Sequence, residues 1–279
     1  MEIIKAIIFG IVEGITEWLP ISSTGHMILL NELIHLNVSH EFYELFEVVI
    51  QLGAILAVIV LYFKTLWPWE FKKSKKETKD TLKLWVKIII ACIPAGVIGV
   101  LFNDLLDKYL YNSIVVSIAL IVYGIIFIIM ENKNIGSKNT KSLNDITYKQ
   151  AFKVGMFQVL ALIPGTSRSG STIIGGLLSG MDRKTIADFT FILAIPIMFG
   201  ASLLKLVKYI KNVGFVFTSM ELSVLLVGSI VAFIVSIFAI KFLINYIKKN
   251  NFKVFGYYRI VLGIIVLLYF FIKYLVLGA

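Results

Sequence analysis

The chain has 279 residues, of which 58% are hydrophobic and 16% charged, and a formal net charge of +10 at pH 7. This balance, together with a mean hydropathy of +0.90, excludes an ordinary soluble domain. The cations gather at the ends of apolar runs and in loops, without the base-stacking or groove-reading pattern of a nucleic-acid-binding protein. We therefore expect a polytopic membrane protein that contacts membrane lipids and has no nucleic-acid partner.

The first apolar stretch, at about residues 3–19, is followed by a polar turn and by a second apolar stretch at about 26–36. Each is shorter than the ~20 residues that a helix needs to cross a bilayer. The first stretch carries Glu13 and Glu17 and lacks a small-residue cleavage site, so we do not interpret it as a signal peptide. The two stretches fit a re-entrant helical hairpin better than two crossings.

Six longer apolar runs are each near the spanning length of ~20 residues. They cover about residues 42–63, 84–102, 114–130, 189–209, 222–246 and 257–276. Between the third and the fourth run, a second polar turn separates two more short stretches, at about 151–163 and 172–181. The sequence therefore predicts six transmembrane helices and a second re-entrant hairpin.

Lysines crowd the segment that follows the first run. They are Lys72, Lys73, Lys75, Lys76, Lys79, Lys83 and Lys87. Because positively charged loops stay in the cytoplasm, we expect this loop inside, together with the segments 131–153, 181–184 and 241–259. Both termini then face outward.

The two halves of the chain are related in sequence. When the chain is shifted by 145 residues, the first polar turn falls on the second. The matched pairs are Gly10 and Gly155, Glu13 and Gln158, Ser22 and Ser167, Thr24 and Ser169, and Gly25 and Gly170. Each half, about 1–145 and 146–279, then holds one hairpin and three spans. Because three is an odd number of crossings, the second half enters the membrane from the opposite face. We expect a single all-α membrane domain built as an inverted repeat, with the hairpin tips meeting near the midplane.

The first half supplies two carboxylates. Glu13 and Glu17 are four residues apart, so on a helix they share one face. Such a pair can bind a hard divalent cation, Mg²⁺ or Ca²⁺, with substrate phosphates as further ligands. The alternatives are a carboxylate pair that shares a proton and a structural pair bonded only to backbone.

A hydroxyl-rich turn follows these carboxylates. Ser22, Ser23 and Thr24 stand at a helix N-terminus, where anions bind readily. Plain N-capping is the alternative interpretation. His26, directly after the turn, can act as a general base or as a nucleophile.

The second turn supplies a guanidinium. Arg168 offers a planar, permanently charged fork that suits bidentate contact with phosphate, and Ser167 and Ser169 beside it add hydroxyl donors. An internal ion pair with Glu13 or Glu17 is the alternative, and the two roles can alternate as substrate comes and goes.

These motifs resemble those of the bacterial undecaprenyl pyrophosphate phosphatases of the bacitracin-resistance type, and the similarity covers the whole chain. The first motif is Glu13-x-x-x-Glu17 with Pro20-Ile-Ser-Ser-Thr-Gly-His26, and the second is Pro164-Gly-Thr-Ser-Arg168-Ser-Gly-Ser-Thr172. The resemblance implies hydrolysis of undecaprenyl pyrophosphate to the monophosphate carrier and phosphate, dependent on Mg²⁺ or Ca²⁺. It also implies a site open to the outer face of the bacterial cytoplasmic membrane, and bacitracin resistance through recycling of the carrier.

With this resemblance we assign roles to the residues of both turns. Glu13 and Glu17 are expected to bind the metal; Ser22, Thr24, Ser167, Arg168 and Ser169 to contact the diphosphate; and Ser23 or His26 to attack it, with Glu17 and Arg168 assisting catalysis. If Ser23 attacks, His26 is its base; if His26 attacks, the hydroxyls orient the phosphate; and a metal-activated water is the third option. A flippase for the lipid carrier is the alternative function, because broken helices and inverted repeats are typical of transporters. The oligomeric state stays open, with a homodimer as one option.

Overall fold

A computed structural model of the protein describes residues 1–69, 73–110, 112–136 and 140–277. These residues form helices and no β-strand, and one isolated bridge pairs Thr140 with Met181. In chain order the helices are α1 (Glu2–Thr16), α2 (Ser23–Leu33), α3 (His40–Leu61), α4 (Phe63–Leu66), α5 (Lys75–Leu110), α6 (Ser113–Asn132), α7 (Tyr148–Val159), η1 (Leu160–Leu162), α8 (Arg168–Leu178), α9 (Arg183–Val213), α10 (Ser219–Lys249) and α11 (Lys253–Leu277). Lys72, expected in a cytoplasmic loop, lies outside the described residues, as do residues 137–139 of the expected segment 131–153.

Six of the described helices are long and apolar enough to cross a membrane. They are α3, α5, α6, α9, α10 and α11, and each covers all or nearly all of one of the six apolar runs. The prediction of six spans is confirmed. Helix α5 begins at Lys75, earlier than expected, because lysine and glutamate favour helix as well as apolar residues do. Apolar length alone therefore does not mark where this helix starts.

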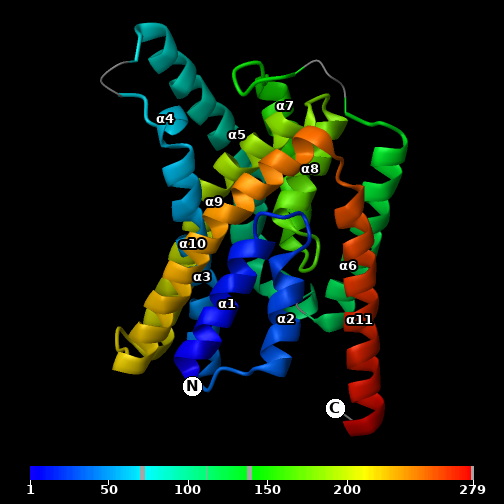
Figure 1. The fold of residues 1–279 in the computed structure, drawn as a ribbon. Helices are drawn as coiled ribbons and strands as arrows, with labels where there is room; N and C mark the ends of the chain where they lie inside the picture. Colours follow the sequence, from blue (N-terminus) through cyan, green and yellow to red (C-terminus); the bar gives the residue numbers. More distant parts are fainter. Residues whose placement is uncertain (70–72, 111, 137–139, 278–279) are drawn as a thin grey trace.

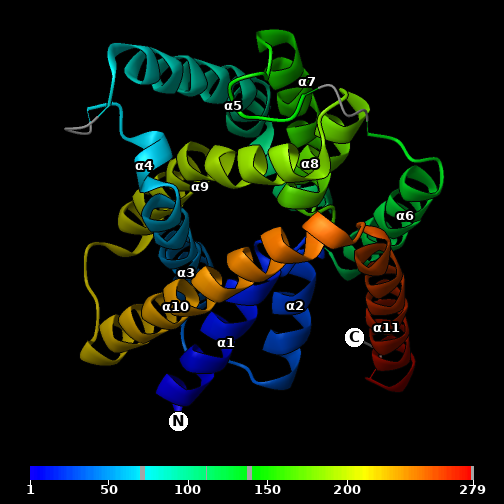
Figure 2. The ribbon, with the colours of Figure 1, turned by 45° about the horizontal axis from the view of Figure 1, so that its top comes forward.

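Two pairs of shorter helices differ from the spans. Helices α1 and α2 are joined by residues 17–22, and α7 with η1 is joined to α8 by residues 163–167. Taken together with the first residues of the helix that follows, these connections are called the first turn (17–26) and the second turn (163–172). The first pair extends from the end of the molecule that holds both termini, and the second from the opposite end, so that the two turns approach each other in the middle (Figure 1). Long helices flank both pairs: α10 and α3 pack against α1, α5 packs against α7, and α9 packs against α8 (Figure 2).

Helices that the 145-residue shift matches pack in matched ways. Helix α1 packs against α10 as α7 packs against α5, and α6 and α11 pack against each other. A glycine permits each of the first two contacts: a Cβ on Gly10 would lie 2.6 Å from the carbonyl oxygen of Gly228, and one on Gly155 would lie 2.5 Å from that of Ala91. Because no side chain fits at these positions, the sequence match of the two glycines reflects the same close approach of backbones in each half.

Helix α8 contributes Ile173, Ile174 and Leu177 to the main hydrophobic core. Every residue of α8 from Ser169 to Leu177 is buried. The same core includes Trp18 of the first turn and Phe191 of α9, whose ring meets Trp18 edge-on with 5.5 Å between the centroids. This apolar packing fixes the positions of both turns and of the side chains that they carry.

Two cations that we assigned to cytoplasmic loops are buried instead. Lys87 is 5% exposed and donates hydrogen bonds to the carbonyl oxygens of Leu143 and Asn144, at 3.3 and 2.9 Å. Arg259 is 0% exposed and lies inside α11. Helices α10 and α11 both continue into the expected cytoplasmic segment 241–259, and only residues 250–252 connect them. The loop assignment of these two residues was therefore wrong.

Candidate active site

The two turns share an unusual backbone conformation. Ser22 has φ 71° and Ser167 has φ 72°, and Asn134 is the only other described non-glycine residue with a positive φ. Each serine caps the following helix: Ser22 Oγ accepts a hydrogen bond from the Gly25 N–H at 3.5 Å, and Ser167 Oγ accepts one from the Gly170 N–H at 3.1 Å. Such a conformation costs on the order of 1–3 kcal/mol and clusters at functional sites. The matched serines thus adopt the same strained cap in both halves.

Side chains of the second turn bind the first turn directly. Arg168 Nη2 donates to Glu17 Oε1 at 2.8 Å. Ser169 Oγ lies 3.3 Å from the carbonyl oxygen of Leu19 and 3.4 Å from that of Glu17. The structure therefore brings together the motifs that the sequence separates by about 150 residues, and Ser169, 1% exposed, faces the backbone of the first turn.

Glu17 joins the guanidinium to a hydroxyl. Its Oε2 accepts a hydrogen bond from Ser23 Oγ at 2.8 Å, while Oε1 binds Arg168. Glu17 is 7% exposed, and both contacts are partly buried at the edge of a cavity. A carboxylate that accepts from a serine hydroxyl can act as the general base that activates this hydroxyl as a nucleophile.

Arg168 is held in place by several contacts. Nη1 donates to the carbonyl oxygen of Thr190 on α9 at 2.9 Å, and the guanidinium carbon lies 5.8 Å from the centroid of the Trp18 ring. Among the described residues, Nε of Arg168 has no hydrogen-bond partner. The guanidinium is thus oriented by protein groups and keeps a donor for a ligand.

His26 uses both of its ring nitrogens in contacts other than Ser23. Nδ1 lies 2.7 Å from the carbonyl oxygen of Ser22, so this nitrogen carries the proton and donates it. Nε2 then accepts from the Tyr258 hydroxyl at 2.7 Å, and the two rings are stacked with 5.6 Å between their centroids. These contacts connect the end of the first turn to α11.

Glu13 is the carboxylate best placed to accept a ligand. It is 1% exposed, and its Oε1 has no hydrogen-bond partner among the described residues. The described part of the chain contains no group of three or more His, Cys, Asp or Glu side chains arranged to hold a metal ion. Protein side chains alone therefore do not form a complete metal site here, and substrate oxygens would have to contribute ligands.

Two neighbouring cavities meet at the first turn. The larger measures about 770 Å³ and the smaller about 230 Å³, and both are lined by Ser23 and Thr24 of the first turn and by Gln51 of α3. The larger cavity also contains Glu13 in its lining. The smaller is further lined by four predicted site residues, Glu17, Ser22, Ser167 and Arg168. All predicted site residues except His26 and Ser169 thus line one or the other of these two neighbouring cavities.

Sequence reasoning missed residues on the spans. Glu47 and Gln51 of α3 line the larger cavity, four residues apart on one helix face. We interpreted the run 42–63 as uninterrupted and apolar, although a charged residue within a span usually marks function; this signal was present. Arg259, whose guanidinium reaches both turns, was missed because it lies near the start of an apolar run.

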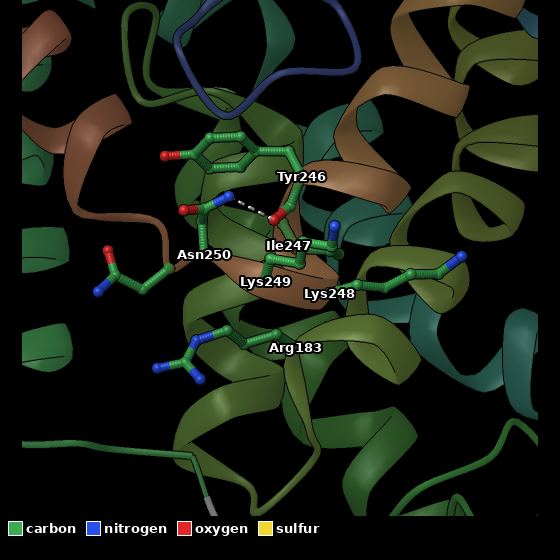
Figure 3. A pocket seen from close by; sticks show the side chains of 7 residues that line it. Arg183, Tyr246, Ile247, Lys248, Lys249 and Asn250 are labelled. Carbon is green, nitrogen blue, oxygen red and sulfur yellow. Dashed lines mark hydrogen bonds between the residues drawn. The ribbon is translucent and has the colours of Figure 1, made fainter.

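A third pocket lies away from the two turns. It measures about 340 Å³ and is lined by Arg183 and by residues 246–251 (Figure 3). Arg183 Nε binds Glu131 Oε1 at 3.1 Å, and the same Glu131 oxygen accepts from the Phe252 N–H at 3.0 Å. This ion pair ties α6 to α9 and to the α10–α11 connection. The pocket holds none of the predicted site residues.

Comparison with known proteins identifies the family. A family model described as bacitracin resistance protein BacA matches residues 6–265. The chain belongs to the BacA family. It is 59% identical to an undecaprenyl-diphosphatase of Acetivibrio thermocellus, over 97% of this chain and 98% of that protein. It is 60% identical to the undecaprenyl-diphosphatase of Enterococcus faecalis, over 95% and 96%, and to undecaprenyl-diphosphatase 1 of Clostridioides difficile, over 98% and 97%. The family match includes both turns and Arg259, and it confirms the resemblance that the motifs indicated.

Proposed function

We propose that this BacA-family chain is an undecaprenyl-diphosphatase, which hydrolyses undecaprenyl diphosphate to the monophosphate carrier and phosphate and so confers bacitracin resistance. The observation that carries the proposal is the junction of Glu17 with Ser23 and Arg168, at 2.8 Å each, beside the joined cavities. It combines a hydroxyl, a base and a phosphate-binding guanidinium in one place. Relatives named as undecaprenyl-diphosphatases, 59–60% identical to the chain, support the substrate.

The geometry favours Ser23 as the nucleophile with Glu17 as its base. Ser23 Oγ would attack the terminal phosphorus while Glu17 takes the hydroxyl proton, and the bond from phosphorus to the bridging oxygen would break. The prenyl monophosphate leaves with that proton. A water then attacks the phosphoserine, gives its proton to Glu17 and releases phosphate, and Glu17 returns the proton to Ser23. His26, bonded to Ser22 and Tyr258, fixes the turn in this scheme.

Arg168 would bind the diphosphate and stabilise its charge. Phosphoryl transfer depends mainly on positioning and charge neutralisation. Arg168 and Thr24 line the smaller cavity, and Arg168 Nε has no hydrogen-bond partner among the described residues, so we assign the phosphates to this cavity. Ser22 and Ser167 line the same cavity and present the helix N-termini that they cap.

A divalent cation, Mg²⁺ or Ca²⁺, fits the remaining carboxylate chemistry. Glu13 lines the larger cavity and has a buried Oε1 without a hydrogen-bond partner among the described residues, and Glu17 lies one helical turn further on. Mg²⁺ is commonly bound by one or two carboxylates together with substrate phosphates, so three protein ligands are not required. Such a cation would neutralise charge on the diphosphate. Glu13 would hold it, and Glu17, whose two oxygens accept from Arg168 and Ser23, would add its negative charge beside it.

We further propose that the chain lies in the cytoplasmic membrane as an inverted repeat, with α1–α2 and α7–α8 as re-entrant hairpins. The larger cavity extends from Ser23 to His40 and Lys208, and the end of the molecule toward which α1 and α2 extend holds both termini (Figure 1). With the termini outside, the site would be open to the outer face. The matched packing of α1 and α7 supports the repeat.

Labelling of single cysteines tests this orientation. The background is Cys92→Ser, and Asn212→Cys lies at the end of the molecule that holds both termini. In intact cells this cysteine should react with a membrane-impermeant thiol reagent, because its position would face outward. Asn144→Cys should react only after lysis. Both positions are exposed in the structure. The reverse pattern would contradict the proposed orientation.

Release of phosphate in detergent tests the activity itself. Purified protein, given a prenyl diphosphate with Mg²⁺ or Ca²⁺, should release inorganic phosphate over many turnovers, because hydrolysis needs no membrane to cross. A flippase would release none under these conditions. That result would favour transport as the function.

Glu17→Gln tests the assignment of the base. The amide keeps the size of the side chain and can still accept from Arg168, but it cannot take the Ser23 proton, so we expect a rate loss of at least about 100-fold. Excess Mg²⁺ should not restore the rate. The measurement is phosphate release, with the melting temperature as a check of folding.

The matched control is Glu32→Gln. Glu32 lines the larger cavity, next to the one that Glu17 lines, but binds Lys273 on α11 at 2.7 Å, away from both turns. We expect a mild effect on the rate. Equal losses in the two variants would point to misfolding and remove the role of Glu17 as base.

A further inference from the structure

Arg259 connects the two turns from a third element. On α11, its Nη1 donates to the carbonyl oxygen of Pro20 at 3.2 Å. Its Nη2 donates to the carbonyl oxygens of Gly165 and Thr166, both at 2.9 Å. One guanidinium thus binds backbone of the first turn and of the second turn at the same time.

Burial of this charge is costly in terms of stability. Arg259 is 0% exposed, and in the part of the chain that the structure describes no carboxylate pairs with it and its Nε has no hydrogen-bond partner. The guanidinium also lies over the ring of Tyr123, with 5.7 Å between its carbon and the ring centroid. Desolvation of an unpaired cation costs several kcal/mol, and an apolar side chain would serve packing better. The presence of Arg259 is therefore better explained by its contacts with the backbone of the two turns than by a contribution to the stability of the fold.

Arg259 also lies close to the groups of the candidate site without lining the cavities. A Cβ added to Gly170, in the first turn of α8, would lie 3.3 Å from Nη1 of Arg259. Gly170 donates its N–H to Ser167 Oγ, and Arg168 lies between these two residues in the sequence. Movement of the guanidinium would therefore change the separation of Glu17 from Arg168, which come from the two turns that it joins.

We propose that Arg259 is a positioning residue for the reaction, which sets the relative placement of the two turns so that Glu17, Ser23 and Arg168 meet. This inference rests on the proposed phosphatase activity. Errors of about 1 Å in the placement of reacting groups can lower a rate by about 100-fold. Arg259 touches no reacting atom in this account; it acts through the carbonyl oxygens of Pro20, Gly165 and Thr166.

The test compares Arg259→Met and Arg259→Lys with Arg183→Lys. Arg183 is the matched control because it is also an arginine that bridges elements, but its partner is Glu131, away from the two turns. For Arg259→Met we expect kcat to fall about 100-fold with KM changed much less. Arg259→Lys keeps the charge and can reach fewer of the three carbonyl oxygens. Its kcat should therefore lie between that of the unmodified protein and that of Arg259→Met. Arg183→Lys should leave kcat near that of the unmodified protein.

A second measurement follows the turns without reference to activity. In a Cys92→Ser background, spin labels at Ile15→Cys on α1 and Leu160→Cys on η1, both exposed, report the distance between the two hairpins. Arg259→Met should broaden this distance distribution, and Arg183→Lys should not. Arg259→Met could broaden the distance distribution while neither the variant nor the unmodified protein releases phosphate. This result would uphold the positioning role and refute the proposed phosphatase activity.

Two outcomes would overturn the positioning role. One is an unchanged kcat and an unchanged distance distribution in Arg259→Met. The other is loss of folding in both Arg259 variants, seen as loss of the thermal unfolding transition, because Arg259 would then act in folding alone.

Discussion

The carboxylate of Glu17 is the contact on which the rest of the site depends. One oxygen accepts from Arg168 of the second turn and the other from Ser23, which begins α2, so a single side chain joins the two motifs. In a largely buried place, loss of one partner of such an ion pair costs about 3–5 kcal/mol because the other charge remains unpaired. Short helices that end in the middle of the protein make the contact geometrically accessible, since α1 and α8 both have a terminus there (Figure 1).

The surrounding structure stabilises this junction in three ways. Ser22 and Ser167 hold both turns in the same strained conformation, each as the cap of the next helix. Apolar packing around Trp18 and α8 restrains the positions of the two turns. Each of the three arginines of the chain forms a contact between elements: Arg168 with Glu17, Arg183 with Glu131, and Arg259 with the backbone of both turns. Arginine suits this use because its donors point in several fixed directions.

Much of this could be predicted from the sequence because the signals are local. Apolar length marked the six spans, and the polar turns within apolar surroundings marked Glu17, Ser23 and Arg168. The partners of His26 and Arg259 could not be predicted in the same way, since Tyr258 and the carbonyl oxygens of the second turn are remote in sequence and a backbone acceptor leaves no residue type to recognise. The division of the cavity lining between α1, α2 and α3 likewise depends on how the helices pack.

Trapping of the transferred phosphoryl group tests the central claim most directly, because attack by Ser23 leaves this group on the protein for part of each cycle. The experiment is rapid quenching with a prenyl diphosphate labelled in its terminal phosphate, followed by mass spectrometry of the peptides. The account predicts an acid-stable adduct on Ser23 that is absent from Ser23→Ala. An acid-labile, base-stable adduct on His26 would contradict it. So would the absence of any adduct together with inversion of configuration at the transferred phosphorus, which would assign the attack to water.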